Sequence, residues 1–400
     1  MNARISQNTL QKGFQEKIFE LLEEPQFSGN TAKRKFAADP DGNPAVKLAI
    51  GNVPLDYDLW EGLRNPAVVG LYPLGLQEIW EFYANRRNQK NDEHGRKKIF
   101  QLPVSFDAAK KNFNRAVIIS VMLPFAPEII RRSVQAITKR KNGSSYAFTQ
   151  MYEEVNGLLD KAVMRMGIEL SSNDVVAVAM HNDTVKKASA ESIPLNRQGD
   201  SHGAFKQVHY PQKSIAVLMG LGQFGVSRIV FRDEMVDGNV QRFTGPLRSI
   251  ILFDKETLTP GKKDDIFFPN DRWREFLSQV SDFAQVDSEI DQYRFCSYSS
   301  AKNRGCRKCV ESCPAGAQEN STPLQSGGYS EKVLKRSRWF HEGKLQFDFN
   351  LCRDDRTQMK ALYPEWSCAR CVSVCAASGL KRKSAVKKFN QMKQQLTQNS

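Results

Sequence analysis

Three segments of the chain carry apolar residues at the spacing of an amphipathic helix. They cover residues 10–24, 76–83 and 146–166. Gly167 follows the third segment directly and is expected to end that helix. The charged run over residues 86–98 is expected to be a solvated connection.

Continuous apolar runs alternate with these helices and predict buried strands. They cover residues 116–123, 175–180 and 245–258. The longest apolar stretch, residues 116–126, contains Pro124 and is shorter than the roughly 18–20 residues that a membrane span requires. Alternation of strands and helices indicates a layered α+β or α/β fold.

A glycine-rich segment links an apolar helix at residues 214–219 to a strand that begins at Ile229. Its glycines, Gly220, Gly222 and Gly225, have the G-x-G-x-x-G spacing of a dinucleotide-binding turn. In that turn the strand precedes the helix, whereas here the helix precedes the strand, so a nucleotide site is rejected. The glycines either let the backbone approach another bound group or form a tight connection without a ligand.

Candidate chemistry is concentrated near the C-terminus, where two similar motifs contain all 8 cysteines of the chain. Each motif ends in C-x2-C-x3-C, the spacing of bacterial ferredoxins. There, a tight loop holds three corners of an iron–sulfur cluster and the fourth cysteine ligates the other cluster. By that rule one [4Fe–4S] cluster has the ligands Cys296, Cys306, Cys309 and Cys375, and the second has Cys352, Cys368, Cys371 and Cys313.

Structural zinc and disulfide bonds are the alternatives for these cysteines. Zinc sites pair C-x2-C units and would not use the further cysteine that closes each motif. Disulfide bonds require an exported protein and would staple only one end of this chain. The nine-residue gap after Cys296 and Ala376 in place of a second proline depart from the ferredoxin pattern, but neither removes a ligand.

Size and charge narrow the remaining possibilities. A chain of 400 residues with 40% hydrophobic content accommodates two or three domains. The N-terminus shows neither an apolar signal core nor a twin-arginine pair, so a cytoplasmic location is expected, where thiolates stay reduced. The net charge of +14 makes nucleic acid a possible partner, although the basic tail at residues 381–400 supplies part of the excess. A basic surface would equally bind an acidic ferredoxin- or flavodoxin-like electron donor.

The order of these motifs resembles one enzyme family. A Gly-Leu-Gly-x-x-Gly segment precedes a ferredoxin-like end, and the second cysteine motif reads Pro364-Glu-Trp-Ser-Cys-Ala-Arg-Cys-Val-Ser-Val-Cys. Over residues 115–378 the chain resembles the corrinoid-dependent reductive dehalogenases and their relatives, the epoxyqueuosine reductases. The Trp339 segment and the short gap between Cys352 and Cys368 are more similar to the dehalogenase branch.

This resemblance implies a nitroreductase-like α/β core that holds a base-off cobalamin beside two [4Fe–4S] clusters, within an α+β chain. The implied division is an N-terminal region of unknown role at residues 1–110, the core at 111–290, a ferredoxin-like domain at 291–380 and the basic tail. In the core, the resemblance directs attention to a corrinoid site around the glycine segment. Its expected cofactor-binding residues are His209, Gly220, Gly222, Gly225 and Arg228.

The family typically protonates its product from a tyrosine assisted by a nearby cation, which stabilises the phenolate. The candidate tyrosines here are Tyr146, Tyr152 and Tyr210, and Arg228 and Arg248 are candidate cations. The Asp-Tyr-His with which epoxyqueuosine reductases open the long helix of the core is missing, because residues 147–152 contain no acid.

Three classes of function follow. The leading expectation is a cobalamin- and iron–sulfur-dependent reductase that cleaves a carbon–halogen or carbon–oxygen bond of a small organic substrate. The second is a tRNA reductase of the epoxyqueuosine kind, which the net charge of +14 favours and the missing acid disfavours. The third is an electron-transfer protein that contains the two clusters and no corrinoid.

Overall fold

The structure is a computed structural model. It describes residues 7–27, 35–56, 71–73, 75–93, 102–113, 115–140, 146–172, 175–180, 207–209, 212–224, 229–236, 239–254, 340–341, 344–345 and 371–372.

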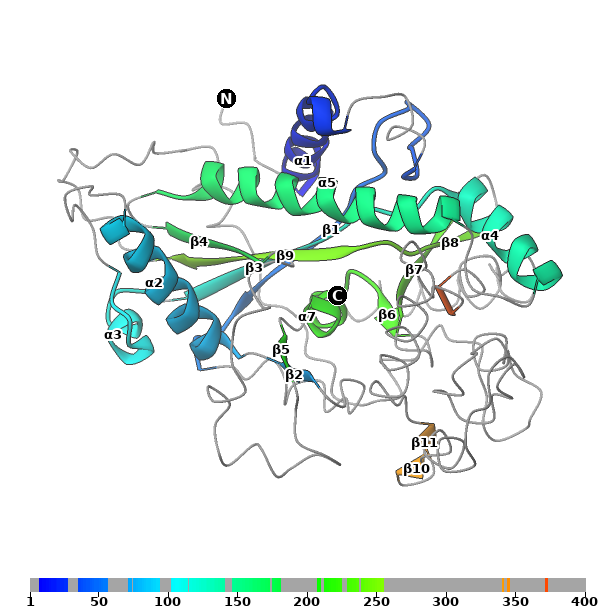
Figure 1. Cartoon of the computed structure of the whole chain (residues 1–400). Coiled ribbons are helices and arrows are strands. Elements are labelled where there is room, and N and C mark those ends of the chain that lie inside the picture. Colours follow the sequence, from blue (N-terminus) through cyan, green and yellow to red (C-terminus); the bar gives the residue numbers. More distant parts are fainter. Residues whose placement is uncertain are drawn as a thin grey trace.

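A four-stranded antiparallel sheet forms the centre of the described part (Figure 1). Its strands lie in the order β1 (Lys47–Val53), β3 (Arg115–Met122), β9 (Leu247–Asp254) and β4 (Val175–Met180). All eight residues of β9 are buried, as are seven of the eight in β3. The two inner strands are therefore covered on both faces, which explains why they appear in the sequence as continuous apolar runs rather than as alternating patterns.

One face of the sheet is covered by α1 (Gln7–Leu22), α4 (Pro127–Arg140) and α5 (Tyr146–Leu170) (Figure 1). Leu48 of β1, Val117, Ile119 and Val121 of β3, and Ile250 and Leu252 of β9 pack with these helices in one hydrophobic cluster. We call this side the α5 face, and its cluster the α5-face cluster.

The opposite face is covered by α2 (Leu76–Glu93), α3 (Phe106–Lys110) and α7 (Gln212–Leu218). The intervening strand residues, such as Ile118 and Ile251, point to this side, as the two-residue period of a strand requires. Trp80 anchors it: the ring lies 4.8 Å from the ring of Phe253 in an edge-on arrangement, and its indole N–H donates to the carbonyl of Pro103 at 2.9 Å. We call this side the α7 face.

Short elements complete the described part. The strands β2 (Leu71–Pro73) and β5 (Gln207–His209) pair in parallel. A separate antiparallel sheet contains β6 (Gln223–Phe224), β7 (Val230–Val236) and β8 (Asn239–Phe243). The remaining elements are the 3-10 turn η1 (Pro25–Phe27) and the strands β10 (Phe340–His341) and β11 (Lys344–Leu345).

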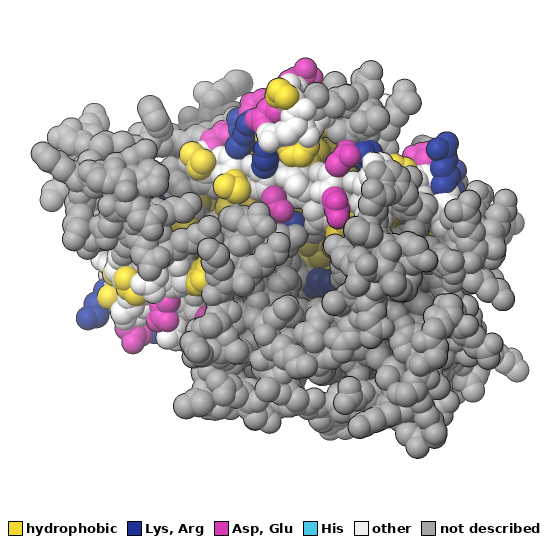
Figure 2. All heavy atoms as spheres, in the orientation of Figure 1, with side chains coloured by type: hydrophobic (Ala, Val, Ile, Leu, Met, Phe, Trp, Pro, Cys, Tyr) yellow, Lys and Arg dark blue, Asp and Glu magenta, His cyan; other side chains and the backbone are white. Residues whose placement is uncertain are grey.

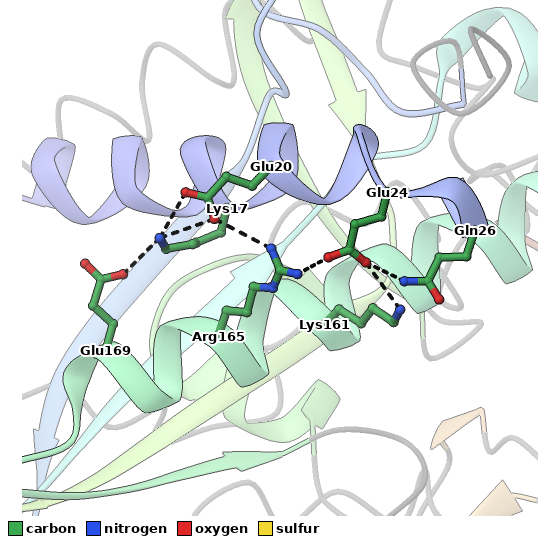
Figure 3. Close-up of polar contacts among 7 residues, drawn as sticks. All are labelled: Lys17, Glu20, Glu24, Gln26, Lys161, Arg165 and Glu169. Atoms are coloured by element: carbon green, nitrogen blue, oxygen red, sulfur yellow. Dashed lines mark hydrogen bonds and ion pairs between the residues drawn. The ribbon is translucent and has the colours of Figure 1, made fainter. Parts of the chain in front are cut away.

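Ion pairs attach α1 to α5 (Figure 3). Lys17 of α1 lies between Glu20 at 3.1 Å and Glu169 of α5 at 3.5 Å. Arg165 of α5 contacts Glu20 at 3.6 Å and also pairs with Glu24. The interior of the contact between α1 and α5 is apolar, and the ion pairs lie at its edge. They therefore add to the apolar packing of α1 and do not replace it.

The mixed α+β composition expected from the sequence is confirmed, and the helix expected at residues 10–24 is present as α1. Two expectations were wrong. The helix α5 continues through Gly167 to Leu170, because this glycine lets the helix lie close to β4: an added Cβ would be 3.1 Å from the Cβ of Ala179. The charged run from residue 86 continues α2 as far as Glu93 rather than forming a connection.

Residues from the first part of the chain contribute to the central layers. The strand β1 pairs with β3 along its full length, from Lys47 opposite Met122 to Val53 opposite Ala116. The helices α1, α2 and α3 cover the two faces of the same sheet. The expected boundary at residue 110 therefore does not coincide with a break between hydrophobic cores.

None of the described helices is both long and apolar enough to span a membrane.

Candidate functional site

Of the predicted cluster ligands, the described part of the chain contains Cys371. It forms a helical pair with Val372, and both residues are half-buried. Val372 packs against the α5-face cluster. The other predicted ligands lie outside the described residues, namely Cys296, Cys306, Cys309, Cys313, Cys352, Cys368 and Cys375.

A half-buried cysteine on a helical turn fits the chemistry of a cluster ligand, because its side chain is not sealed in the core. Among the described residues no three His, Cys, Asp or Glu side chains gather as a metal site. The seven cysteines that would complete the two clusters are not among the residues to which that finding applies.

Gly220 ends α7 by a Schellman arrangement. Its own N–H donates to the carbonyl of Val217 at 3.0 Å, and the next N–H, of Leu221, donates to the carbonyl of Ala216 at 2.8 Å. The φ of Gly220 is +74°, a left-handed conformation that glycine adopts without the steric cost of a Cβ. Leu221 is fully buried, and a buried apolar residue at this position frequently accompanies the motif.

Gly222 is required by close packing within the chain. A Cβ at this position would lie 2.7 Å from the carbonyl oxygen of Phe231 and 2.8 Å from Cγ1 of Val230, both on β7. No side chain fits that space unless the strand moves. Two of the three glycines in the motif are thus explained by the connection itself, which is the ligand-free alternative for this segment.

The other expected cofactor-binding residues are only partly placed. His209 is the last residue of β5, where its backbone pairs with Pro73 of β2, and its side chain lies outside the described ones. Gly225, Arg228 and the candidate acid Tyr210 lie outside the described residues.

The two candidate tyrosines on α5 lie apart from the glycine segment. Tyr152 is half-buried, its ring is 6.0 Å from that of Phe125, and it packs against the α5-face cluster. Tyr146 is the first residue of α5. In contrast, Leu221 belongs to the cluster on the α7 face. The sheet therefore separates Tyr152 from a group bound against Gly220 and Gly222 on the α7 face.

Arg248, a candidate cationic partner for a tyrosine, forms a buried polar network instead. Its side chain is 4% exposed and binds both carboxylate oxygens of Asp160, one of them at 2.9 Å. It also donates to Oδ1 of Asn156 at 3.0 Å and to the carbonyl of Leu247 at 2.7 Å. Its donors are largely used by these contacts, so Arg248 holds α5 against β9.

Sequence reasoning missed the partners of Arg248, although a signal was present. Asn156 and Asp160 follow Tyr152 at intervals of four residues, so all three lie along one side of α5. Polar residues repeated at this interval on the buried face of a helix indicate a buried partner on the neighbouring element.

Two serine hydroxyls form a further polar feature, on the α7 face. Ser120 of β3 and Ser249 of β9 stand directly opposite each other, both 0% exposed. Within the described part of the chain neither hydroxyl has a hydrogen-bond partner, and the same holds for Oε1 of the buried Gln212. Its amide nitrogen donates to the carbonyl of Met180 at 2.9 Å. Buried water is the ordinary partner of such groups.

A part-buried ion pair joins β1 to β7. Nζ of Lys47 lies 2.6 Å from Oε2 of Glu234, and Nε of Arg232 lies 2.6 Å from Oε1 of the same carboxylate. Burial on its own would raise the pKa of Glu234, but the hydrogen bond and charge of Lys47, with the charge of Arg232, lower that pKa below its ordinary value. Glu234 is therefore a structural anion with two cationic partners.

Acidic and basic side chains are interspersed on the described part of the surface, as Figure 2 shows for the side that carries α1 and α5. A polyanion would meet carboxylates as well as cations there, so the described side chains on this side form no basic patch. No family model, no curated protein and no solved structure matches this chain.

Proposed function

We propose that this chain is an iron–sulfur oxidoreductase that holds two [4Fe–4S] clusters and a base-off corrinoid, and that it reductively cleaves a carbon–halogen or carbon–oxygen bond of a small organic substrate. The observation that carries the proposal is the pair of C-x2-C-x3-C motifs, which contain 6 of the 8 cysteines. When bound, the clusters would pass single electrons from a ferredoxin- or flavodoxin-like donor to the cobalt, which performs the bond cleavage.

The residues of the chain would bind these groups, exclude water and supply a proton. The thiolates of the two motifs would ligate iron, in a cytoplasmic setting that keeps them reduced. The proton would come from a tyrosine hydroxyl. For a corrinoid bound against the glycine segment that tyrosine would be Tyr210, which lies outside the described residues, because the central sheet separates Tyr152 from that segment. Arg248 is not the cationic partner of the tyrosine in this proposal, because its contacts are to Asp160, Asn156 and Leu247.

A second candidate is an electron-transfer protein that carries the clusters and no corrinoid. The specific observation that favours it is that Gly220 and Gly222 are required by the helix end and by contact with β7, without any bound group. The tRNA reductase is less favoured, because carboxylates alternate with cations on the described surface in Figure 2.

The deciding experiment is metal analysis and electron paramagnetic resonance on protein purified without oxygen after expression with iron and hydroxocobalamin. The proposal expects about eight iron and one cobalt per chain, with a base-off Co(II) signal. About eight iron without cobalt would leave the electron-transfer protein, and zinc in place of iron would remove both candidates. Binding to tRNA that weakens linearly in log salt would instead support the tRNA reductase.

A further inference from the structure

Two serines place polar side chains in the apolar interior of the α7 face. Ser120 of β3 lies directly opposite Ser249 of β9, and both residues are 0% exposed. Side chains directly opposite each other in an antiparallel pair have Cβ atoms about 4.5–5.5 Å apart. The helix α7 packs on the same two strands, on the side of the sheet away from α5 (Figure 1). The two hydroxyls are therefore close neighbours on the side of the sheet that α7 covers.

Gln212, the first residue of α7, brings a third polar group to this place. Its side chain is buried, and its amide nitrogen donates to the carbonyl of Met180 at 2.9 Å. Met180 of β4 lies directly opposite Ser249, so this bond holds the amide beside the serine pair. In the part of the chain that the structure describes, three buried oxygen atoms from β3, β9 and α7 thus come together without a hydrogen-bond partner.

The serine pair is also the place where the side chains of the sheet reach least far toward α7. On the same face, the neighbouring pairs of β3 and β9 carry large apolar side chains, namely Ile118 with Ile251 and Met122 with Leu247. A serine side chain is shorter than any of these. A buried water needs a small space that is lined by polar groups, and the serine pair offers both features.

The hydrogen-bonding capacity of the three groups defines what can bind between them. The amide oxygen of Gln212 only accepts, so the bound molecule must donate, whereas each serine hydroxyl can donate or accept. The buried members of the cluster on the α7 face are all apolar, and burying an unpaired charge among them would cost far more than burying a neutral group. The molecule is therefore small, uncharged, and both a donor and an acceptor, which is the chemistry of water.

We propose that Ser120, Ser249 and Gln212 form an internal water site, in which one ordered water bridges the two serine hydroxyls and donates to the amide oxygen of Gln212. Three hydrogen bonds are the usual number for a buried water. The water connects β3 and β9 to the first residue of α7, and α7 leads directly into the glycine segment at Gly220. The site therefore helps to position that segment. The inference is independent of the proposed function, since it involves no cysteine and no cofactor.

The test is a double-mutant cycle of Ser120→Ala and Ser249→Ala, measured by urea unfolding of the full chain. Each single variant should raise the equilibrium constant of unfolding roughly 2–12-fold, the effect of losing about one hydrogen bond. The double variant should raise it by less than the product of the two factors, because both hydroxyls share one water. If the two hydroxyls lack a partner in solution, the single variants should instead be as stable as wild type or more stable, and this result would overturn the proposal.

The matched control is Thr149→Val combined with Ser120→Ala. Thr149 on α5 also has a buried hydroxyl without a partner among the described residues, but it belongs to the helix on the other face of the sheet. The effects of this pair should multiply. A serine pair whose effects also multiply would show that the two hydroxyls share no water, and would overturn the bridged site.

Two further measurements examine the water and the glycine segment directly. A crystal structure should show one water within hydrogen-bond distance of both hydroxyls, and a dry contact at this place would overturn the site. Hydrogen exchange of the amides of Gly220 and Leu221, which close the end of α7, should accelerate in both single variants. Unchanged exchange of these amides would overturn the role of the water in positioning the glycine segment.

Discussion

The buried network of Arg248 gives the sharpest prediction for stability. The guanidinium is 4% exposed and holds Asp160, whose side chain is 20% exposed, together with Asn156. Replacing Asp160 by alanine would leave a cation in the core without its anion. The free energy of unfolding should fall by about 3–5 kcal/mol, the usual cost of breaking a buried ion pair.

Replacing the arginine should cost less than replacing the aspartate. In Arg248→Met the cation is removed and the chain of the methionine fills most of its volume, while the remaining carboxylate of Asp160 still reaches water. We expect a loss of about 1–3 kcal/mol, from the polar atoms that lose a partner. The double variant should then be more stable than Asp160→Ala alone, because no unpaired cation remains.

Urea unfolding followed by far-ultraviolet circular dichroism measures these differences from the transition midpoints and slopes. The matched control is Arg131→Met, since Arg131 and its partner Glu128 are 67% and 64% exposed and an exposed pair contributes about 1 kcal/mol or less. If Arg248→Met fails to rescue Asp160→Ala, or if Asp160→Ala is no worse than the exposed control, the network does not hold α5 on β9.

Three further predictions concern other parts of the chain. Gly222→Ala should lower the urea midpoint more than Gly220→Ala. The alanine at position 222 would force its Cβ to 2.7 Å from a carbonyl oxygen, whereas the alanine at position 220 would meet open space and suffer only the backbone strain of φ +74°. Equal losses of stability in the two variants would contradict the packing argument. The pKa of Glu234 is lowered in the folded state, so the stability it contributes is present above the ordinary value of 4.5 and is lost as the pH falls through the lower folded value. Lys47→Met should therefore flatten the decline of stability measured by urea unfolding between pH 7 and pH 3, and an unchanged decline would show that this pair does not contribute. Cys375→Ser should halve the iron content to about four per chain, since the ferredoxin pattern makes this cysteine the fourth ligand of one cluster. Retention of about eight iron would show that this cysteine is not a required ligand.

Several elements were accessible from local pattern. The apolar runs at residues 116–123 and 175–180 predicted the strands β3 and β4. Both faces of the central sheet are covered, so residues on either side of these strands are apolar and no alternation with polar residues is seen. The end of α7 could also be predicted from local sequence, because a glycine directly after an apolar helix is typical of a left-handed cap. Gly167 carries the same local signal, yet the helix continues through it. Here the glycine leaves room for Ala179 of β4, whose Cβ would lie 3.1 Å from an added Cβ, and β4 comes from a later segment of the chain.

The candidate site likewise has features that the sequence shows and features that only the structure shows. The cysteine motifs and their ferredoxin spacing are a property of the sequence, because a cluster ligand set depends on residue type and on short intervals. The face of the sheet on which each candidate residue lies cannot be predicted from residue type and short intervals. Tyr152 and the glycine segment were equally plausible neighbours in the sequence, and only the packing of α5 and α7 on the two faces of the central sheet separates them.

The sequence by itself determined the residue chemistry, the main helices and buried strands, and the mixed α+β class, since these depend on side-chain type and local periodicity. Only the tertiary structure decided that β1 joins the central sheet, that Arg248 is paired with Asp160, and that Val372 packs against the α5-face cluster. Each of these contacts joins segments far apart along the chain, where no local interval specifies the partner, so the choice depends on how the layers pack.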